Sequence, residues 1–319
     1  MTTSSSPIAP PQALVQGVSQ TNQAIPQIDS AVAALLALPP ASGTTLANLP
    51  ADVSKACSDA AQWNTTYRAQ VISALQMVVD WNATFNGFYS QLQALATQMV
   101  AGEVAAVAPF QSILQQLQAA TQGLAASTGA VSKQLVSYET LISGDIATLN
   151  GDQASLQATQ KSDQETEQAA QQRLQSLESQ QQQQQRLYHR IQGIPIYGRY
   201  LAALEEALQV LSGNIANQRA ATNAAQATLN SANAAAKAAG QAATDTATAN
   251  TDLGAIASGV GALDQGWNVL DSNFNELISS ESITTYNVFT PALLQATQAD
   301  WNNLAGQAAS LLPATAQAA

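Results

Sequence analysis

The sequence has 319 residues, of which 10% are charged and 5% aromatic, and its formal net charge is −11. With so few large side chains, the chain is expected to bury apolar surface along narrow seams between long helices rather than in one compact core. The acidic balance excludes a nucleic-acid partner, and because the ten basic residues are scattered, charge alone would not recruit the chain to an anionic membrane.

The first residues, MTTSSSPIAPPQ, contain neither the basic nor the apolar segment of a secretory signal. No window of the sequence has the roughly 20 uninterrupted apolar residues of a membrane-spanning helix. We therefore expect a soluble protein that is secreted without a recognisable signal peptide. The residues up to position 40 predict a short helix interrupted at Pro26.

Large apolar residues recur at steps of three and four from Trp63 to Met99. A strand would instead alternate with period two, so this spacing predicts a long helix of roughly 45 residues. Asp52 or Ser54 is expected to cap its start, after a break at Pro50, and Gly102 is expected to mark its end.

A second seam begins at Phe110, keeps the same rhythm to Leu156 and then thins into polar residues. The next proline is Pro195, so the seam predicts one helix from Phe110 to about Arg190. A third helix is expected after Pro195. It starts with a leucine stripe, passes through an alanine-rich region that suits close helix packing, and ends in a second aromatic-rich seam.

These elements predict an all-α fold, an elongated bundle of long antiparallel helices with a tail bundle at one end and a small head at the hairpin tip. Residues 1–186 would supply the first part of the tail bundle and the outgoing long helix, and 187–213 the head. Residues 214–319 would supply the returning helix and a last tail helix after Pro291, all within one elongated unit. Such a turn would bring the aromatic-rich flanks of the chain together.

The residues that usually carry catalysis are scarce. His189 is the only histidine and Cys57 the only cysteine, so nucleophilic pairs, disulfides and His- or Cys-based metal cages have no basis. Glycine-rich phosphate loops are also missing. We therefore predict no enzyme activity, no catalytic or metal-binding residues and no cofactor. Cys57 is expected to be a small buried side chain and His189 a solvated one.

Two segments resemble a known family. Residues 56–95, ACSDAAQWNTTYRAQVISALQMVVDWNATFNGFYSQLQAL, resemble the second helix of the α-helical pore-forming toxins related to haemolysin BL, the non-haemolytic enterotoxin and cytolysin A. Residues 291–312, PALLQATQADWNNLAGQAASLL, resemble the closing helix of that family. The resemblance implies the family's order of a tail bundle, a long helix, a head, a second long helix and a return to the tail.

The resemblance also implies a role for the central segment Leu187–Gly213, which corresponds to the family's lipid-contacting head. Gly193, Pro195 and Gly198 would act as its hinge. The residues expected to contact the target-cell membrane are Leu187, Tyr188, Ile191, Ile194, Ile196, Tyr197, Tyr200, Leu201, Leu204 and Leu208.

This head departs from the long apolar heads of lytic members, because it contains Arg190, Arg199, Glu205 and Glu206. Since a charge at the bilayer centre costs about 2.5–3.5 kcal/mol, an amphipathic helix at the membrane surface is the more favourable arrangement. Its lipid-facing side would carry Tyr197, Tyr200, Leu201, Leu204 and Leu208. The sequence thus predicts an accessory member of a multi-component toxin, which associates with host membranes and acts with homologous components or as a self-oligomer.

A non-toxic coiled-coil protein, such as a scaffold or a structural part of a secretion apparatus or phage, explains the helical seams equally well. It does not explain why aromatic residues gather at the flanks of the chain while apolar residues surround the central turn. Binding of the isolated protein to liposomes distinguishes the two classes.

Overall fold

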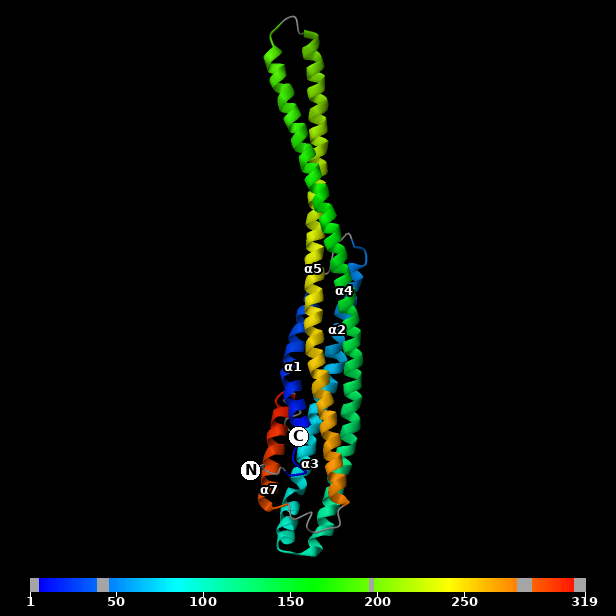
Figure 1. Ribbon diagram of the computed structural model, residues 1–319, viewed down its shortest axis with the longest axis vertical. Coiled ribbons are helices and arrows are strands. Elements are labelled where there is room, and N and C mark those ends of the chain that lie inside the picture. The colour runs from blue at the N-terminus through cyan, green and yellow to red at the C-terminus, as the bar shows by residue number, and fades with distance from the viewer. Residues whose placement is uncertain (1–5, 39–45, 195–197, 280–288, 313–319) are drawn as a thin grey trace. The chain divides into compact units, whose positions relative to one another are not determined.

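The computed structural model describes residues 6–38, 46–194, 198–279 and 289–312. Their regular structure is helical throughout, as Figure 1 shows. The elements are α1 (Gln12–Leu36), α2 (Leu49–Gln62), the π-helical segment η1 (Trp63–Tyr67), α3 (Arg68–Val100), the 3-10 helix η2 (Val104–Ala106), α4 (Val107–Ile191), α5 (Gly198–Ile278) and α7 (Pro291–Ala309). The prediction of an all-α fold built from long helices is confirmed.

The chain divides into two compact units. Unit 1 comprises residues 1–37, 56–145 and 245–319, and unit 2 comprises residues 38–55 and 146–244. Helices α4 and α5 contribute to both. The predicted head, residues 187–213, lies within unit 2, and its existence as a separate domain stays a prediction.

The ends of the helices follow local backbone chemistry. Gly102 has a φ of 87°, and the hydrogen bonds from Gly102 N–H to Met99 O (2.9 Å) and from Glu103 N–H to Gln98 O (3.0 Å) form a Schellman motif. Gly102 therefore ends the helix as predicted. The uninterrupted helix expected from Phe110 to Arg190 is confirmed by α4.

Two expectations about prolines are wrong. Pro50 does not precede its helix but lies in the first turn of α2. Backbone N–H groups in the first turn have no partner within the helix, so the missing N–H of proline costs no hydrogen bond there. Asp52 and Ser54 lie inside the helix, so neither is its cap. Pro26 does not interrupt α1, which continues to Leu36. An interior proline costs about 3 kcal/mol. Here Ile25 and Ile28 are buried on either side of it, and their packing offsets that penalty.

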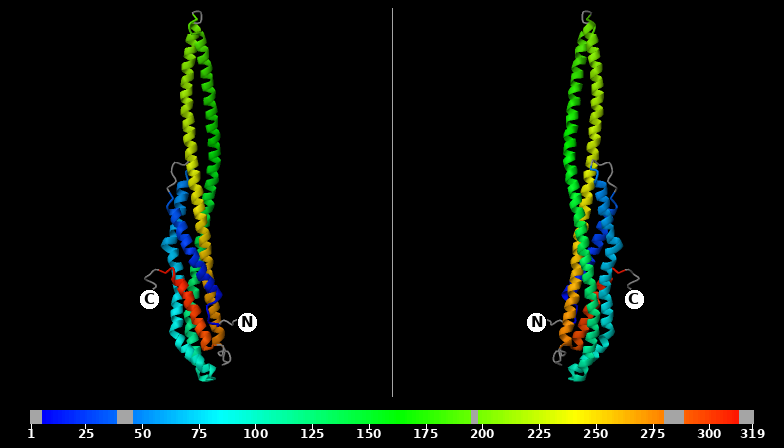
Figure 2. Two further views of the ribbon diagram at one scale, coloured as in Figure 1. Left: turned by 90° about the vertical axis from the view of Figure 1, so that its left-hand side faces the viewer. Right: turned by 90° about the vertical axis from the view of Figure 1, so that its right-hand side faces the viewer.

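Unit 1 is held together by an aromatic cluster around Trp81. Its ring centroid lies 4.0 Å from that of Trp301 on α7 and 6.1 Å from that of Trp267 on α5, and all three rings are buried. Figure 2 shows α7 (red) beside α3 (cyan) in both views, in agreement with these contacts. The aromatic-rich flanks of the chain therefore meet, as predicted.

Two of the three buried indole N–H groups of the cluster have hydrogen-bond partners on further elements. Trp81 Nε1 donates to Thr121 Oγ1 on α4 at 3.0 Å, and Trp301 Nε1 donates to the Ile8 carbonyl oxygen at 2.9 Å. Because an unsatisfied buried donor is costly, these bonds fix which helix faces which.

The π-helical segment η1 was not predicted, and it positions two side chains on one carboxylate. Trp63 Nε1 donates to Asp29 Oδ1 at 2.7 Å, and Arg68 Nε donates to both Asp29 oxygens at 3.1 Å. In a regular α-helix, a side chain five residues after another points about 140° away from it around the helix axis. The wider π turn reduces this angle, so both side chains reach Asp29 on α1.

Unit 2 contains a hairpin formed by the later part of α4 and the earlier part of α5. Its cross-helix hydrogen bonds run antiparallel, from Gln160–Asn233 through Gln218–Ala170 and Arg219–Glu178 to Tyr188–Glu205. Alanines fill much of the seam, and those buried on α5 are Ala232, Ala235, Ala239, Ala242 and Ala243. The predicted close packing through alanine is therefore confirmed.

Candidate functional site

The turn between α4 and α5 contains Gly193. Its φ of 94° lies in the left-handed region that side chains with a Cβ rarely adopt, and the Ile194 N–H donates to the Ile191 carbonyl oxygen at 3.2 Å. Gly198 is the first residue of α5. Of the remaining predicted tip residues, Pro195, Ile196 and Tyr197 lie outside the described residues.

Three of the predicted contact residues expose a large part of their side chains. Leu187 is 45% exposed, Ile194 41% and Tyr200 63%. They come from the last turns of α4, the turn itself and the first turn of α5, respectively, so the end of the hairpin carries solvent-exposed apolar and aromatic groups from both helices.

The other predicted contact residues do not form one outward face. Leu204 is buried, and the half-buried residues are Tyr188, Ile191, Leu201 and Leu208. In this hairpin α4 lies along α5 and covers the leucine stripe of α5. The membrane contact expected of Tyr197, Tyr200, Leu201, Leu204 and Leu208 stays a prediction, and of the four members that the structure describes only Tyr200 is largely exposed.

A polar contact joins the two helices just below the turn. The Tyr188 hydroxyl donates to Glu205 Oε1 at 2.7 Å, and this hydrogen bond raises the pKa of Tyr188 above its ordinary value. Tyr188 is thus hydrogen-bonded to one of the two carboxylates nearest the tip. Sequence reasoning treated Tyr188 as a lipid contact and Glu205 as a free charge, because it had no information on the register between the helices.

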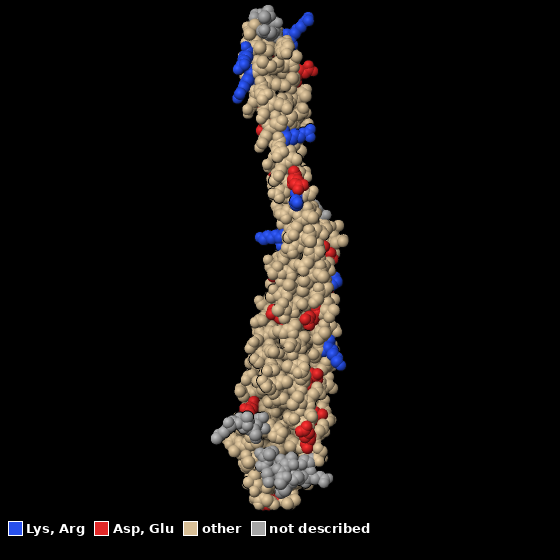
Figure 3. Space-filling view, in the orientation of Figure 1, with Lys and Arg blue, Asp and Glu red and all other residues tan. Residues whose placement is uncertain are grey.

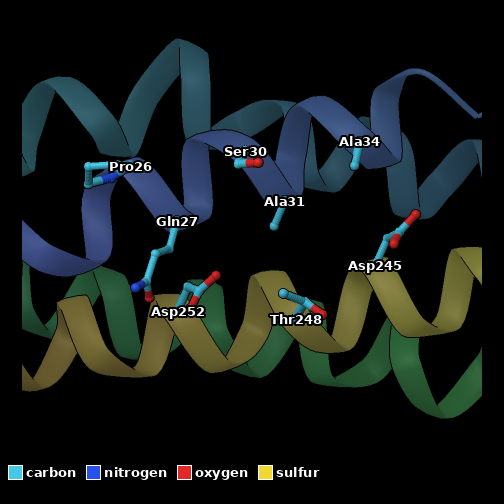
Figure 4. Close-up of a pocket in the computed structure, with 8 residues that line it drawn as sticks. All are labelled: Pro26, Gln27, Ser30, Ala31, Ala34, Asp245, Thr248 and Asp252. Atoms are coloured by element: carbon cyan, nitrogen blue, oxygen red, sulfur yellow. The ribbon is translucent and has the colours of Figure 1, made fainter.

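A second feature is the groove between α1 and α5 in unit 1, which Figure 4 shows. It measures ≈ 580 Å³ and forms where Ser30, Ala31 and Ala34 leave α5 partly uncovered. Gln27 extends across it toward Asp252 on α5, whose pKa is raised by burial. No cluster of three metal-ligating side chains occurs here or elsewhere in the part of the chain that the structure describes.

Cys57 is half-buried on α2 rather than fully buried. Its Sγ donates to the Leu35 carbonyl oxygen at 3.5 Å, and burial raises the pKa of the thiol. A raised pKa disfavours the nucleophilic thiolate. His189, by contrast, is exposed as predicted, with its ring centroid 5.8 Å from that of Tyr188.

Comparison with known families decides the relationship of the chain. The model of the Bacillus haemolytic enterotoxin (HBL) family matches residues 20–184, just over half of the 319 residues. The chain belongs to this family. The predicted resemblance to α-helical toxins related to haemolysin BL is confirmed.

Solved structures share the fold of this haemolytic enterotoxin family member. The soluble AhlC triple head mutant, from the tripartite α-pore-forming toxin AHL of Aeromonas hydrophila, aligns with a TM-score of 0.61 at 16% identity, covering 93% of this chain and 98% of that one. The HblL1 toxin component of Bacillus cereus aligns with a TM-score of 0.59 at 14% identity, covering 93% and 94%. The AhlB pore of Aeromonas hydrophila aligns with a TM-score of 0.52 at 13% identity, covering 95% and 98%. A search of curated proteins finds no match.

Within the described ranges of this family member, none of the helices is apolar enough over a sufficient length to cross a membrane. The exposed apolar groups at the α4–α5 turn are separate side chains on a polar hairpin.

Proposed function

We propose that the protein is a component of a multi-component α-helical pore-forming toxin that acts on target-cell membranes together with homologous components. The observation that carries this function is the match of the haemolytic enterotoxin family to residues 20–184. The alignment of over nine tenths of the chain with components of tripartite toxins adds the fold. The protein would leave its producing cell and associate with a host membrane.

The end of the α4–α5 hairpin is the proposed lipid contact. Support comes from the exposed side chains of Leu187, Ile194 and Tyr200, because an aromatic ring and branched aliphatic groups favour the boundary between headgroups and acyl chains. Arg190 and Arg199 lie among them and favour a position at the membrane surface over deep insertion. We therefore assign the protein an accessory role, in which a partner component forms the transmembrane part of the pore.

The assay for this function is lysis of erythrocytes, measured as released haemoglobin. The purified protein alone should lyse few cells, whereas addition of the proteins encoded beside it should produce lysis that requires all components. Lysis by those proteins that is unchanged when this chain is omitted would exclude the proposed role.

A matched pair of variants tests the lipid contact itself. Leu187→Asp with Tyr200→Asp places two charges at exposed tip positions and should abolish membrane association. Val136→Asp with Val269→Asp adds the same charge at exposed positions of unit 1 and should leave association unchanged. The buried Leu204 is unsuitable, because an aspartate there would disrupt the contact between α4 and α5. Equal behaviour of the two variants would contradict a lipid contact at the tip.

A further inference from the structure

The end of the α4–α5 hairpin differs in charge from the rest of the protein. Between Ser179 and Leu204 the chain contains Arg186, Arg190 and Arg199 and no aspartate or glutamate. Because the whole chain has a formal net charge of −11, the remaining residues carry −14. Unit 1 contains only two of the ten basic residues, Arg68 and Lys133.

The three tip arginines are available to a ligand. Their side chains are exposed, and none of them forms an ion pair with a residue that the structure describes. Arg68 and Arg219, in contrast, are paired with Asp29 at 3.1 Å and with Glu178 at 2.8 Å. Figure 3 shows basic side chains on both edges of the hairpin end, with an acidic side chain at a similar height on one edge.

The arrangement combines guanidinium groups with apolar groups on one end of the hairpin. Arg186 and Arg190 are one helical turn apart and share a face of α4, while Arg199 is the second residue of α5. The exposed Leu187, Ile194 and Tyr200 lie at the same end. A planar guanidinium binds phosphate oxygens in a bidentate manner, so this end offers phosphate recognition beside groups that favour a lipid interface.

We propose that this basic tip, formed by Arg186, Arg190 and Arg199, binds the phosphate groups of anionic phospholipids in the target membrane. The proposal rests on the membrane role proposed above and adds the class of lipid. Nucleic acid offers the same phosphates, but the charge of −14 on the remaining residues opposes binding along a polyanion. A membrane is compatible with this charge, because only the tip needs to approach its surface.

The expected effect follows from the attraction of basic residues to an anionic surface. Each arginine near such a surface strengthens binding about fivefold, so the three together contribute a factor on the order of 10². This contribution should fall at high ionic strength, because exposed charges are screened by salt.

The test is co-flotation of the full-length protein with vesicles of phosphatidylcholine, or of an equal mixture of phosphatidylcholine and phosphatidylserine. The tip variant carries Arg186→Gln, Arg190→Gln and Arg199→Gln. The control variant carries Lys161→Gln, Arg173→Gln and Lys237→Gln, which remove the same charge from exposed positions of unit 2 outside the tip. Circular dichroism and thermal unfolding should be the same for all three proteins, because the replaced side chains are exposed and unpaired.

The wild type and the control variant should bind the anionic vesicles on the order of 10²-fold more tightly than the neutral ones. The tip variant should bind both kinds of vesicle with similar, weak affinity. Equal binding of the wild type to both vesicles, or equal losses in both variants, would overturn the proposal and leave the toxin function standing.

Two further outcomes separate this inference from the proposed function. If the tip variant binds vesicles normally but fails to lyse erythrocytes with its partner components, the arginines act on an acidic partner protein and the lipid proposal is wrong. If the wild type binds no vesicle and adds nothing to lysis, the toxin function fails as well.

Discussion

At the residue scale, Trp81 shows how single side chains organise unit 1. It contacts aromatic rings from α5 and α7 and donates its indole hydrogen bond to Thr121 on α4, so one side chain of α3 joins three other helices. Such a residue contributes both buried area and a specific polar contact, and the two act together to select one arrangement of the helices.

Trp81→Ala should therefore lower the free energy of unfolding by about 3–5 kcal/mol, because it leaves a large cavity and removes the hydrogen bond that Thr121 Oγ1 accepts. Phe88→Ala on the same helix removes a half-buried ring and should cost clearly less. Urea unfolding followed by circular dichroism measures both. Equal effects of the two substitutions would mean that the cluster around Trp81 is not the main support of unit 1.

Asp152 lies beside Asp52 in unit 2. Partial burial raises the pKa of Asp152 above its ordinary value of 3.8, and the charge of Asp52 and a hydrogen bond to it add to the shift. Between pH 3.8 and the raised value, the folded chain binds more protons than the unfolded chain. The stability that this group contributes is therefore present at low pH and is lost as the pH rises through the raised pKa.

Asp152→Asn should accordingly raise the free energy of unfolding at neutral pH and weaken its decline between mildly acidic and neutral conditions. Urea unfolding over that pH range measures the effect. Glu165→Gln, at an exposed position of α4 in the same unit, removes the same charge and serves as the control. If Asp152→Asn lowers the stability at neutral pH and Glu165→Gln does not, the interaction between Asp152 and Asp52 is not unfavourable at that pH.

At the element scale, the contact of α1 with α5 depends on glycine. A Cβ added at Gly259 would lie 3.1 Å from the Thr21 backbone nitrogen and 3.2 Å from the Gly17 carbonyl oxygen, and one added at Gly266 would lie 2.7 Å from the Leu14 backbone nitrogen. The backbones of the two helices are therefore too close to admit a side chain at these points.

Gly266→Ala should destabilise the protein by about 1–3 kcal/mol, because the added methyl group forces α1 away from α5. Gly213→Ala, also inside α5 but with open space around its Cβ position, should stabilise the protein by up to about 1 kcal/mol through higher helix propensity. Thermal unfolding distinguishes the two. Stabilisation by both substitutions would show that helix propensity rather than close packing governs both sites.

The elements that the sequence predicted correctly are those whose apolar residues recur over many turns, such as α4. The errors occur where a local signal competes with tertiary packing. Pro26 predicts a break on local grounds, but buried neighbours on both sides maintain the helix. The π segment leaves the four-residue spacing of Trp63, Tyr67 and Val71 intact, so the hydrophobic pattern contains no sign of it.

The candidate site was predictable to a similar extent. The glycine and proline residues near position 193 located the turn, because the backbone preferences of these residues act locally, over a few positions. The spacing of Leu201, Leu204 and Leu208 identified a stripe but not what covers it, which depends on the pairing of two helices far apart in sequence. The net charge of the whole chain gives no indication of the local excess of arginine.

At the scale of the whole molecule, helix α4 passes through two different environments. Its residues 107–145 belong to unit 1 and are anchored by buried side chains that include Phe110, Leu117 and Tyr138. Among residues 157–191, all of which the structure describes, only Glu167 is buried. Most helical stability comes from the burial of an apolar face rather than from intrinsic propensity, so the two parts of α4 should differ in local stability.

Native-state amide hydrogen exchange, measured by mass spectrometry of the full-length protein, should detect this difference. Peptides from residues 157–191 should exchange more than about tenfold faster than peptides from residues 107–145, a difference of at least about 1.4 kcal/mol in the free energy of opening. Both sets belong to one helix without an interior break, so each serves as the control for the other. Equal protection would mean that α4 opens as a single unit. Faster exchange near the tip would identify the hairpin as the part of the protein that rearranges at the lowest cost, as its proposed contact with a membrane requires.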